Sequence, residues 1–289
     1  MAEFRILGPS DEGRLETFLL SRVESSVFLL DNLRQAGLSD RGGRHEASYA
    51  AVLVEGAVAA VVAHCRNGVM LLQASEGLAE LLPLALKATR RPISGFVGPW
   101  GQIETARRLA EPKDRPVQLD SRQRLCVLAL SDLRIPPILA DGAVRCRAAE
   151  AAELERLAPW REAYNRELLG MPAGAEAGDE AREELARLQR QDNLWVLTDG
   201  GEPVAMAAFN AALPEIVQVG GVFTPPALRG QGYGRAAVAG ALRAAAARGA
   251  AKAVLFHGER NPQAGSAYAA LGFVPIGDYG LVLYEGYRR

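Results

Sequence analysis

The chain has 289 residues, a length typical of two domains or one large one, and its 49% hydrophobic and 23% charged residues exclude a disordered protein. Its formal net charge of −1 gives no support for a general electrostatic attraction to nucleic acid or to an anionic membrane. Cys65, Cys126 and Cys146 show no C-x-x-C spacing. This argues against a disulfide framework and a structural zinc site, and it fits a reducing compartment.

The N-terminal residues lack the basic start and the apolar run of a secretory signal. The most hydrophobic stretch, residues 50–65, is interrupted by Glu55 and Gly56 and is too short to span a bilayer. We therefore expect a cytoplasmic protein with no membrane partner. All but three of the 33 basic residues are arginines, which indicates a GC-rich, bacterial genome.

In the first half, hydrophobic patterning predicts a strand and then an amphipathic helical stretch, a strand–turn–strand unit, and alternating strands and helices. In chain order these segments are residues 4–8, 11–38, 48–65, 68–75, 77–88, 93–100, 102–110 and 123–133. No glycine-rich turn precedes the helices of this half.

The second half repeats the opening order, with a strand, two helices and a strand–turn–strand unit at residues 142–148, 148–170, 176–190 and 194–211. The strand–turn–strand units of the two halves lie about 145 positions apart. The sequence therefore predicts a tandem repeat of one α+β fold, each copy a mixed, mostly antiparallel sheet flanked by helices. Paired prolines place a linker at residues 134–142, between domains at 1–135 and 143–289.

A glycine loop joins an apolar strand, residues 215–224, to an alanine-rich helix that ends at Gly249. The loop directs several backbone N–H groups beside the positive end of the helix dipole, an arrangement suited to a pyrophosphate. Its residues are Arg229, Gly230, Gln231, Gly232, Tyr233, Gly234 and Arg235.

Two nucleotide motifs compete for this loop. The sequence G-x-x-x-x-G-K-[ST] is absent, which excludes a P-loop. Residues 232–237 match G-x-G-x-x-A, and Glu259 lies where a ribose-binding acid belongs. However, only 55 residues follow Gly234, too few to complete a doubly wound sheet. An NAD(P)-dependent oxidoreductase stays as the weaker alternative.

The spacing Arg229-x-x-Gly232-x-Gly234 resembles the R/Q-x-x-G-x-G/A signature of the GNAT superfamily of acyl-CoA-dependent N-acetyltransferases. A second pattern follows, with Asn261 as an N-cap, Tyr268, and Gly272 at the end of the helix. The resemblance covers residues 143–289. The first half is similar, by element order alone, to the degenerate GNAT-like domain that precedes a working one in some tandem members.

The resemblance implies that acetyl-CoA binds as the acyl donor, without a metal. The pantetheine would pair with the backbone of Val222, Phe223 and Thr224, one of whose N–H groups would polarise the thioester carbonyl. Asn261 would contact CoA. Tyr268, protonated at neutral pH, would protonate the departing thiolate.

The sequence leaves the general base open. Gln218 stands where some members carry a glutamate, and it cannot act as a base. Glu215 is three residues early, His257 is a further candidate, and a water-relayed proton requires neither. Trp160, Tyr164 and Glu167, at helical spacing, are candidates for the acceptor pocket.

These observations favour acetyl transfer to a primary amine of a small molecule or peptide, by direct attack in a ternary complex. A non-catalytic acyl-CoA-binding or regulatory protein is the main alternative. We expect a monomer or a homodimer that binds no nucleic acid.

Overall fold

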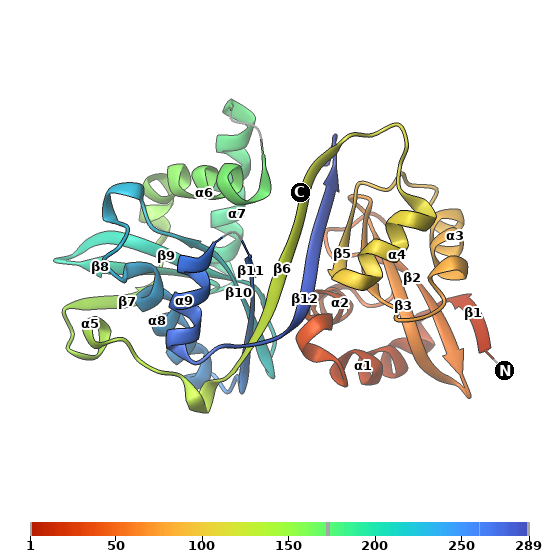
Figure 1. The fold of residues 1–289 in the computed structure, drawn as a ribbon, viewed down its shortest axis with the longest axis horizontal. Coiled ribbons are helices and arrows are strands. Elements are labelled where there is room, and N and C mark those ends of the chain that lie inside the picture. Colours follow the sequence, from red (N-terminus) through yellow and green to blue (C-terminus); the bar gives the residue numbers. More distant parts are fainter. Residues whose placement is uncertain (1, 172–173, 260, 288–289) are drawn as a thin grey trace. The chain divides into compact units, whose positions relative to one another are not determined.

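The computed structural model describes residues 2–171, 174–259 and 261–287. The chain divides into two compact units. Unit 1 comprises Met1–Leu125 together with Gly277–Arg289, and unit 2 comprises Cys126–Ile276. Strands β6 and β12 each cross a boundary between the units (Figure 1).

Unit 1 contains a mixed sheet with the strand order β1-β2-β3-β4-β5-β12-β6. The pairs from β1 to β4 are antiparallel, β4 and β5 are parallel, and β5 and β12 are antiparallel. Its elements are β1 (Ala2–Ile6), α1 (Glu12–Leu20), α2 (Val23–Ala36), β2 (Ala47–Val54), β3 (Ala57–Cys65), β4 (Val69–Gln73), α3 (Leu78–Thr89), β5 (Gly95–Pro99), α4 (Trp100–Ala110), β6 (Val117–Ala129) and β12 (Val274–Tyr284).

Unit 2 has the strand order β6-β11-β10-β9-β8-β7; the pairs from β7 to β10 are antiparallel, and β10 and β11 are parallel. Its elements are α5 (Pro137–Ala140), β7 (Val144–Ala148), α6 (Leu154–Leu169), α7 (Ala175–Arg190), β8 (Leu194–Asp199), β9 (Glu202–Ala212), β10 (Ile216–Phe223), α8 (Tyr233–Ala247), β11 (Lys252–Gly258) and α9 (Pro262–Leu271). The predicted α+β class and mixed, mostly antiparallel sheets are confirmed.

A shared ion pair marks the repeat at residue level. In unit 1, Arg5 on β1 forms two hydrogen bonds to Asp11, whose carboxylate also accepts from the Gly8 N–H. In unit 2, Arg147 on β7 does the same with Glu153, which accepts from the Glu150 N–H. Each arginine and each acid lies 142 positions from its counterpart, so the two units begin with the same strand-to-helix joint.

The boundaries of the units differ from the sequence-based division at 135 and 143. The last strand, β12, pairs with β5 over Tyr279–Leu283 and therefore belongs to unit 1. The predicted linker contains α5 and lies inside unit 2, where Ile138 and Leu139 join the hydrophobic cluster. Strand pairing between distant segments, rather than a composition change, sets these boundaries.

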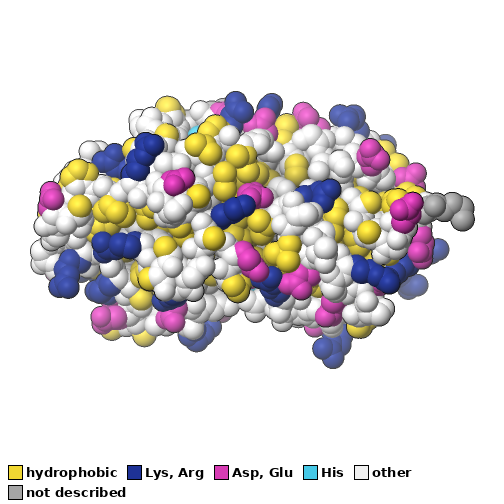
Figure 2. All heavy atoms as spheres, turned by 90° about the horizontal axis from the view of Figure 1, so that it is seen from below, with side chains coloured by type: hydrophobic (Ala, Val, Ile, Leu, Met, Phe, Trp, Pro, Cys, Tyr) yellow, Lys and Arg dark blue, Asp and Glu magenta, His cyan; other side chains and the backbone are white. Residues whose placement is uncertain are grey.

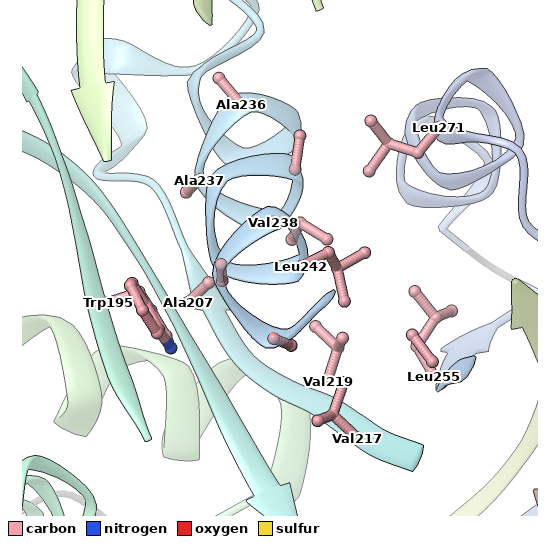
Figure 3. Close-up of a cluster of buried hydrophobic side chains, with 14 of the residues drawn as sticks. Trp195, Ala207, Val217, Val219, Ala236, Ala237, Val238, Leu242, Leu255 and Leu271 are labelled. Carbon is pink, nitrogen blue, oxygen red and sulfur yellow. The ribbon is translucent and has the colours of Figure 1, made fainter. Parts of the chain in front are cut away.

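Alanine-rich α8 packs on one face of the unit 2 sheet (Figure 3). Ala236, Ala237, Val238 and Leu242 are fully buried against strand residues that include Val219. The short alanine side chains let α8 approach the strands closely, so the start of α8 is fixed beside the end of β10.

Acidic and basic side chains are interspersed on the face seen in Figure 2, as the near-zero net charge leads one to expect. Within the described residues, every helix is too short or too polar to cross a bilayer.

Candidate functional site

Strands β10 and β11 separate at one end. Their parallel pairs run from Ile216↔Lys252 to Val219↔Leu255, whereas β10 continues to Phe223 and β11 to Gly258. The β9–β10 register shifts at the same place, between Gly220 and Phe223, where β10 holds one extra residue. Such a bulge bends a strand and ends its pairing, which opens the β10 edge to an extended ligand.

The loop after β10 presents backbone N–H groups at the N-terminus of α8. Gly230 and Gly232 have φ values of +82° and +80°, a conformation that glycine adopts without strain. The Ala236 N–H makes the first bond of the helix, to the Gly232 carbonyl, so the N–H groups of residues 233–235 precede the intrahelical ladder. A Cβ at Gly230 would meet no atom within 4 Å. The loop is therefore an open anion cradle at a helix dipole.

Two arginines flank this cradle. The Nε atom of Arg235 is buried without a hydrogen-bond partner in the structure, and its Nη2 would lie 3.7 Å from a Cβ at Gly232. A buried donor of this kind indicates a missing acceptor. Arg229 is half exposed, and its Nε donates to the Thr224 carbonyl at 3.0 Å. Arg229 and Arg235 therefore place positive charge beside the loop.

The cradle and the strand end are in direct contact. A Cβ at Gly234 would lie 3.2 Å from Thr224 Oγ1 and 3.8 Å from Val222 Cγ1. The guanidinium of Arg229 also lies 5.5 Å from the ring centroid of Phe223. The structure thus brings together the predicted residues of β10 and of the loop. Gln231 is exposed beside them, and Tyr233 donates its hydroxyl to Asp199 at 2.5 Å.

Helix α9 supplies the second predicted pattern. The Asn261 side chain caps it by accepting from the Ala264 N–H at 3.0 Å. The Tyr268 ring lies 6.1 Å from the His257 ring on β11. Burial raises the pKa of Tyr268 above its ordinary value, and nearby Tyr164 and Cys126 raise it further. Tyr268 therefore holds its proton throughout the neutral range.

The structure does not bring Glu215 to the separated strand end. Glu215 directly precedes β10, and its carbonyl accepts from the N–H groups of Ala251 and Lys252 at the opposite end of the strand. Gln218 is buried, with its oxygen accepting from Asn210 Nδ2 at 2.8 Å and its nitrogen donating to the Val219 carbonyl at 2.7 Å. Gln218 therefore serves the strand rather than a proton transfer.

The three acceptor-pocket candidates lie on α6 and take different positions. The Trp160 ring lies 6.5 Å from the Phe223 ring, and Tyr164 is close enough to Tyr268 to affect its pKa. Both aromatic side chains thus border the strand end. Glu167 instead forms an ion pair with Arg229 at 3.0 Å, so it faces the anion cradle.

Sequence reasoning missed Arg161 and Glu184, a buried pair beside the separated strand end. The signal was present, since Arg161 shares the helical spacing of the buried Leu157, Ala158 and Asn165. An arginine on the apolar stripe of a helix requires an acidic partner, and that partner lies on the next helix. Among the described residues, no group of three or more His, Cys, Asp or Glu could hold a metal ion.

Comparison with known proteins agrees with this geometry. Residues 155–273 match the model of the acetyltransferase (GNAT) family. The comparison with curated proteins found no match.

Three solved structures are similar over nearly the whole chain. A Drosophila protein has a TM-score of 0.68 at 14% identity, covering 97% of this chain and 98% of its own. A GCN5-related N-acetyltransferase from Sphaerobacter thermophilus has a TM-score of 0.58 at 13% identity, covering 97% and 94%. A tandem GNAT protein from the clavulanic acid biosynthesis pathway has a TM-score of 0.57 at 12% identity, covering 100% of both chains. At these identities the similarity establishes the fold, which confirms the predicted tandem of GNAT-like domains.

Proposed function

We propose that the chain, whose residues 155–273 match the model of the acetyltransferase (GNAT) family, transfers an acetyl group from acetyl-CoA to a primary amine of a small molecule or peptide. The observation that carries the proposal is the contact between two features of unit 2. The open edge of β10 lies directly against an anion cradle at the start of α8, through Gly234 and Thr224. This arrangement suits a ligand with a pyrophosphate and an extended arm.

The residues at the cradle fit the pyrophosphate. The N–H groups that precede the α8 ladder, together with Arg229 and Arg235, would bind its oxygens. Asn261, at the start of α9, would contact the same ligand. Acetyl-CoA supplies the acyl group activated as a thioester, so no metal is needed.

The residues at the strand end would carry the chemistry. The backbone of Val222, Phe223 and Thr224 would hold the extended arm, and an N–H group there would polarise the reacting carbonyl. Burial raises the pKa of Tyr268, so this residue holds its proton at neutral pH and would donate it to the departing sulfur. The amine would attack directly, in a ternary complex.

Neither Glu215 nor Gln218 supplies a base for the proton of the amine. Glu215 lies at the far end of β10, and Gln218 cannot accept a proton. We therefore propose that water carries this proton away, which is possible because one face of the site borders partly exposed Trp160 and Tyr164.

The test is release of free CoA from acetyl-CoA with a panel of primary amines, with mass spectrometry of the acetylated product. We expect turnover with at least one amine and none with the Gly232→Asp variant. Tight CoA binding without acyl transfer to any amine would instead favour a non-catalytic acyl-CoA-binding protein. Affinity for NAD(P)H above that for CoA would favour an oxidoreductase.

A further inference from the structure

Arg161 on α6 is buried against the strand that the proposed function assigns to the acyl donor. Its side chain is 1% exposed. Two hydrogen bonds join its guanidinium to Glu184 on α7, Nε to Oε2 at 2.7 Å and Nη2 to Oε1 at 2.5 Å. The guanidinium also lies 4.7 Å from the ring centroid of Tyr164. The orientation of Arg161 is therefore fixed from two sides.

The third side of the guanidinium faces Gly221 in β10. A Cβ at Gly221 would lie 2.5 Å from Arg161 Nη1 and 3.2 Å from the Ala208 Cβ. Gly221 also has a φ of +59°, which an L side chain rarely adopts. Both the backbone conformation and the close approach of Arg161 thus require glycine here.

Gly221 lies within the bulge of β10. The pairs with β9 pass from Gly220↔Ala208 to Phe223↔Met206, so β10 has one residue more than β9 in this interval. A bulge with a left-handed glycine changes the direction of the residues after it. Those residues are Val222, Phe223 and Thr224, whose backbone is proposed to polarise the acyl carbonyl.

We propose that Arg161 and Glu184 are positioning residues that hold the β10 bulge in the shape needed for acyl transfer. The inference rests on the proposed function of the strand end. The pair acts through Gly221 rather than on a ligand, because both side chains are buried.

The fold alone does not require a charged pair at this place. Replacing a buried ion pair with apolar residues of similar size is often neutral or stabilising. With the 142-residue offset of the repeat, the residue of unit 1 that corresponds to Arg161 is Leu19 on α1. The Leu19 side chain is 0% exposed. In unit 1, β4 pairs with β3 without a register shift. The Arg161–Glu184 ion pair thus occurs in unit 2, whose strand β10 is bulged, whereas the corresponding strand β4 of unit 1 is regular.

The same pair links the strand to the acceptor side. Arg161 stands on α6 between Trp160, near the Phe223 ring, and Tyr164, which its guanidinium contacts. A fixed Arg161 would therefore help to hold the end of β10 in position, together with the Trp160 and Tyr164 side chains that border it.

The experiment uses the full chain with the double substitution Arg161→Met and Glu184→Leu, which removes both charges and keeps most of the volume. The matched control is Arg147→Met with Glu153→Leu, a bidentate pair of unit 2 that joins β7 to the residue before α6. Hydrogen exchange is measured by mass spectrometry on peptides covering residues 216–224, together with kcat for acetyl transfer, the affinity for CoA and the Tm.

We expect the double variant to speed exchange at residues 220–224 at least about tenfold and to lower kcat about 100-fold. The CoA affinity should change less than about threefold, since the cradle at α8 is intact. The control should leave exchange at 220–224 and kcat unchanged.

Unchanged exchange and unchanged kcat in the double variant would overturn the proposal. If exchange rises across the whole of unit 2, the fold itself has failed, and Arg161→Lys decides instead. Lysine keeps the positive charge but loses the bidentate hydrogen bond to Glu184. We therefore expect hydrogen exchange in Arg161→Lys to rise at residues 220–224 alone. No rise there would also overturn the proposal. The exchange readout needs no turnover, so a wild-type chain that acetylates no amine would contradict the proposed function without deciding this one.

Discussion

The two units share a strand order but differ where β4 of unit 1 and β10 of unit 2 end. In unit 2, β10 is bulged, and its pairing with β11 stops at Val219. In unit 1, β4 is regular, and β5 stays against it, since a Cβ at Gly98 would lie 2.8 Å from the Leu72 carbonyl oxygen. The Ala74 N–H at the end of β4 is also occupied, by Gln102 Oε1 at 2.8 Å. Unit 1 therefore closes the edge that unit 2 leaves open.

The N-termini of the helices that follow these strands, α3 and α8, also differ in how much open space surrounds the cap glycine. Gly77 and Gly232 are both left-handed N-caps, of α3 and α8, with φ values of +77° and +80°. A Cβ at Gly77 would lie 3.0 Å from Val52 and 3.2 Å from Phe4, whereas one at Gly232 would meet nothing closer than 3.7 Å. Glu76 precedes Gly77, where the unit 2 loop carries arginines.

A shared fold and a shared cap glycine are therefore not sufficient for an anion site. The site also requires open space above the glycines, positive charge and a strand edge without a partner. Unit 2 combines all three, and unit 1 has a hydrophobic wall and an acid instead. We therefore expect one CoA molecule per chain.

Substitution of the two cap glycines, Gly232 and Gly77, should have opposite effects on CoA binding and on stability. Gly232→Asp places a negative charge and a side chain in the cradle and should abolish CoA binding in calorimetric titration. Gly77→Asp clashes with Val52 and Phe4, so it should lower the Tm and leave the CoA affinity unchanged. A stoichiometry of two CoA molecules per wild-type chain would contradict the division between the units.

The second prediction concerns Tyr268, since α4 of unit 1 contains no tyrosine. Tyr268→Phe should lower kcat about 10²- to 10⁴-fold, the usual cost of losing a general acid, with CoA affinity nearly unchanged. Burial raises the pKa of Tyr268 above its ordinary value of about 10, and the acid works only when protonated, so this group should cause no fall in kcat between about pH 7 and pH 9. A variant that keeps wild-type kcat would show that Tyr268 only packs.

Arg229→Ala tests the charge that unit 1 lacks. Removing a charge-assisted hydrogen bond costs about 1.5–3 kcal/mol, which corresponds to a loss of about 10- to 150-fold in CoA affinity. Arg229 also donates to the Thr224 carbonyl, so part of the loss comes from the strand end. Titration of CoA measures it, and an unchanged affinity would remove Arg229 from the site.

Much of this site could be predicted from local sequence. The glycine spacing, Asn261 and Tyr268 are local signals, because a helix N-terminus and its cap are built from adjacent residues. The strand–turn–strand repeats likewise predicted the order of elements in both units.

The features that local sequence could not predict depend on contacts between distant residues. The pairing of β12 with β5 joins positions 180 to 188 residues apart, from Tyr279↔Pro99 to Leu283↔Gly95, and carries no local signal. Glu215 lies near the loop in sequence, but an extended strand separates it from the loop by the length of β10. The Arg161–Glu184 bond spans two helices, and spacing on one helix indicates only that Arg161 is buried.

Glu167 forms an ion pair with Arg229, the arginine that we propose to bind the pyrophosphate, and its substitution should have a smaller effect. The ion pair between Glu167 Oε2 and Arg229 Nη2 is 3.0 Å long, and both side chains are 40% or more exposed. A pyrophosphate must share or displace this contact, so Glu167→Gln should tighten CoA binding. Exposed pairs contribute about 0.2–1 kcal/mol, which sets the gain at about 1.5- to 5-fold. Glu162→Gln, which removes the same charge from the same helix, is the matched control. The difference between the two variants should shrink at high salt, because exposed charges are screened. Equal affinities in both variants at low salt would show that Arg229 is already free to bind the ligand.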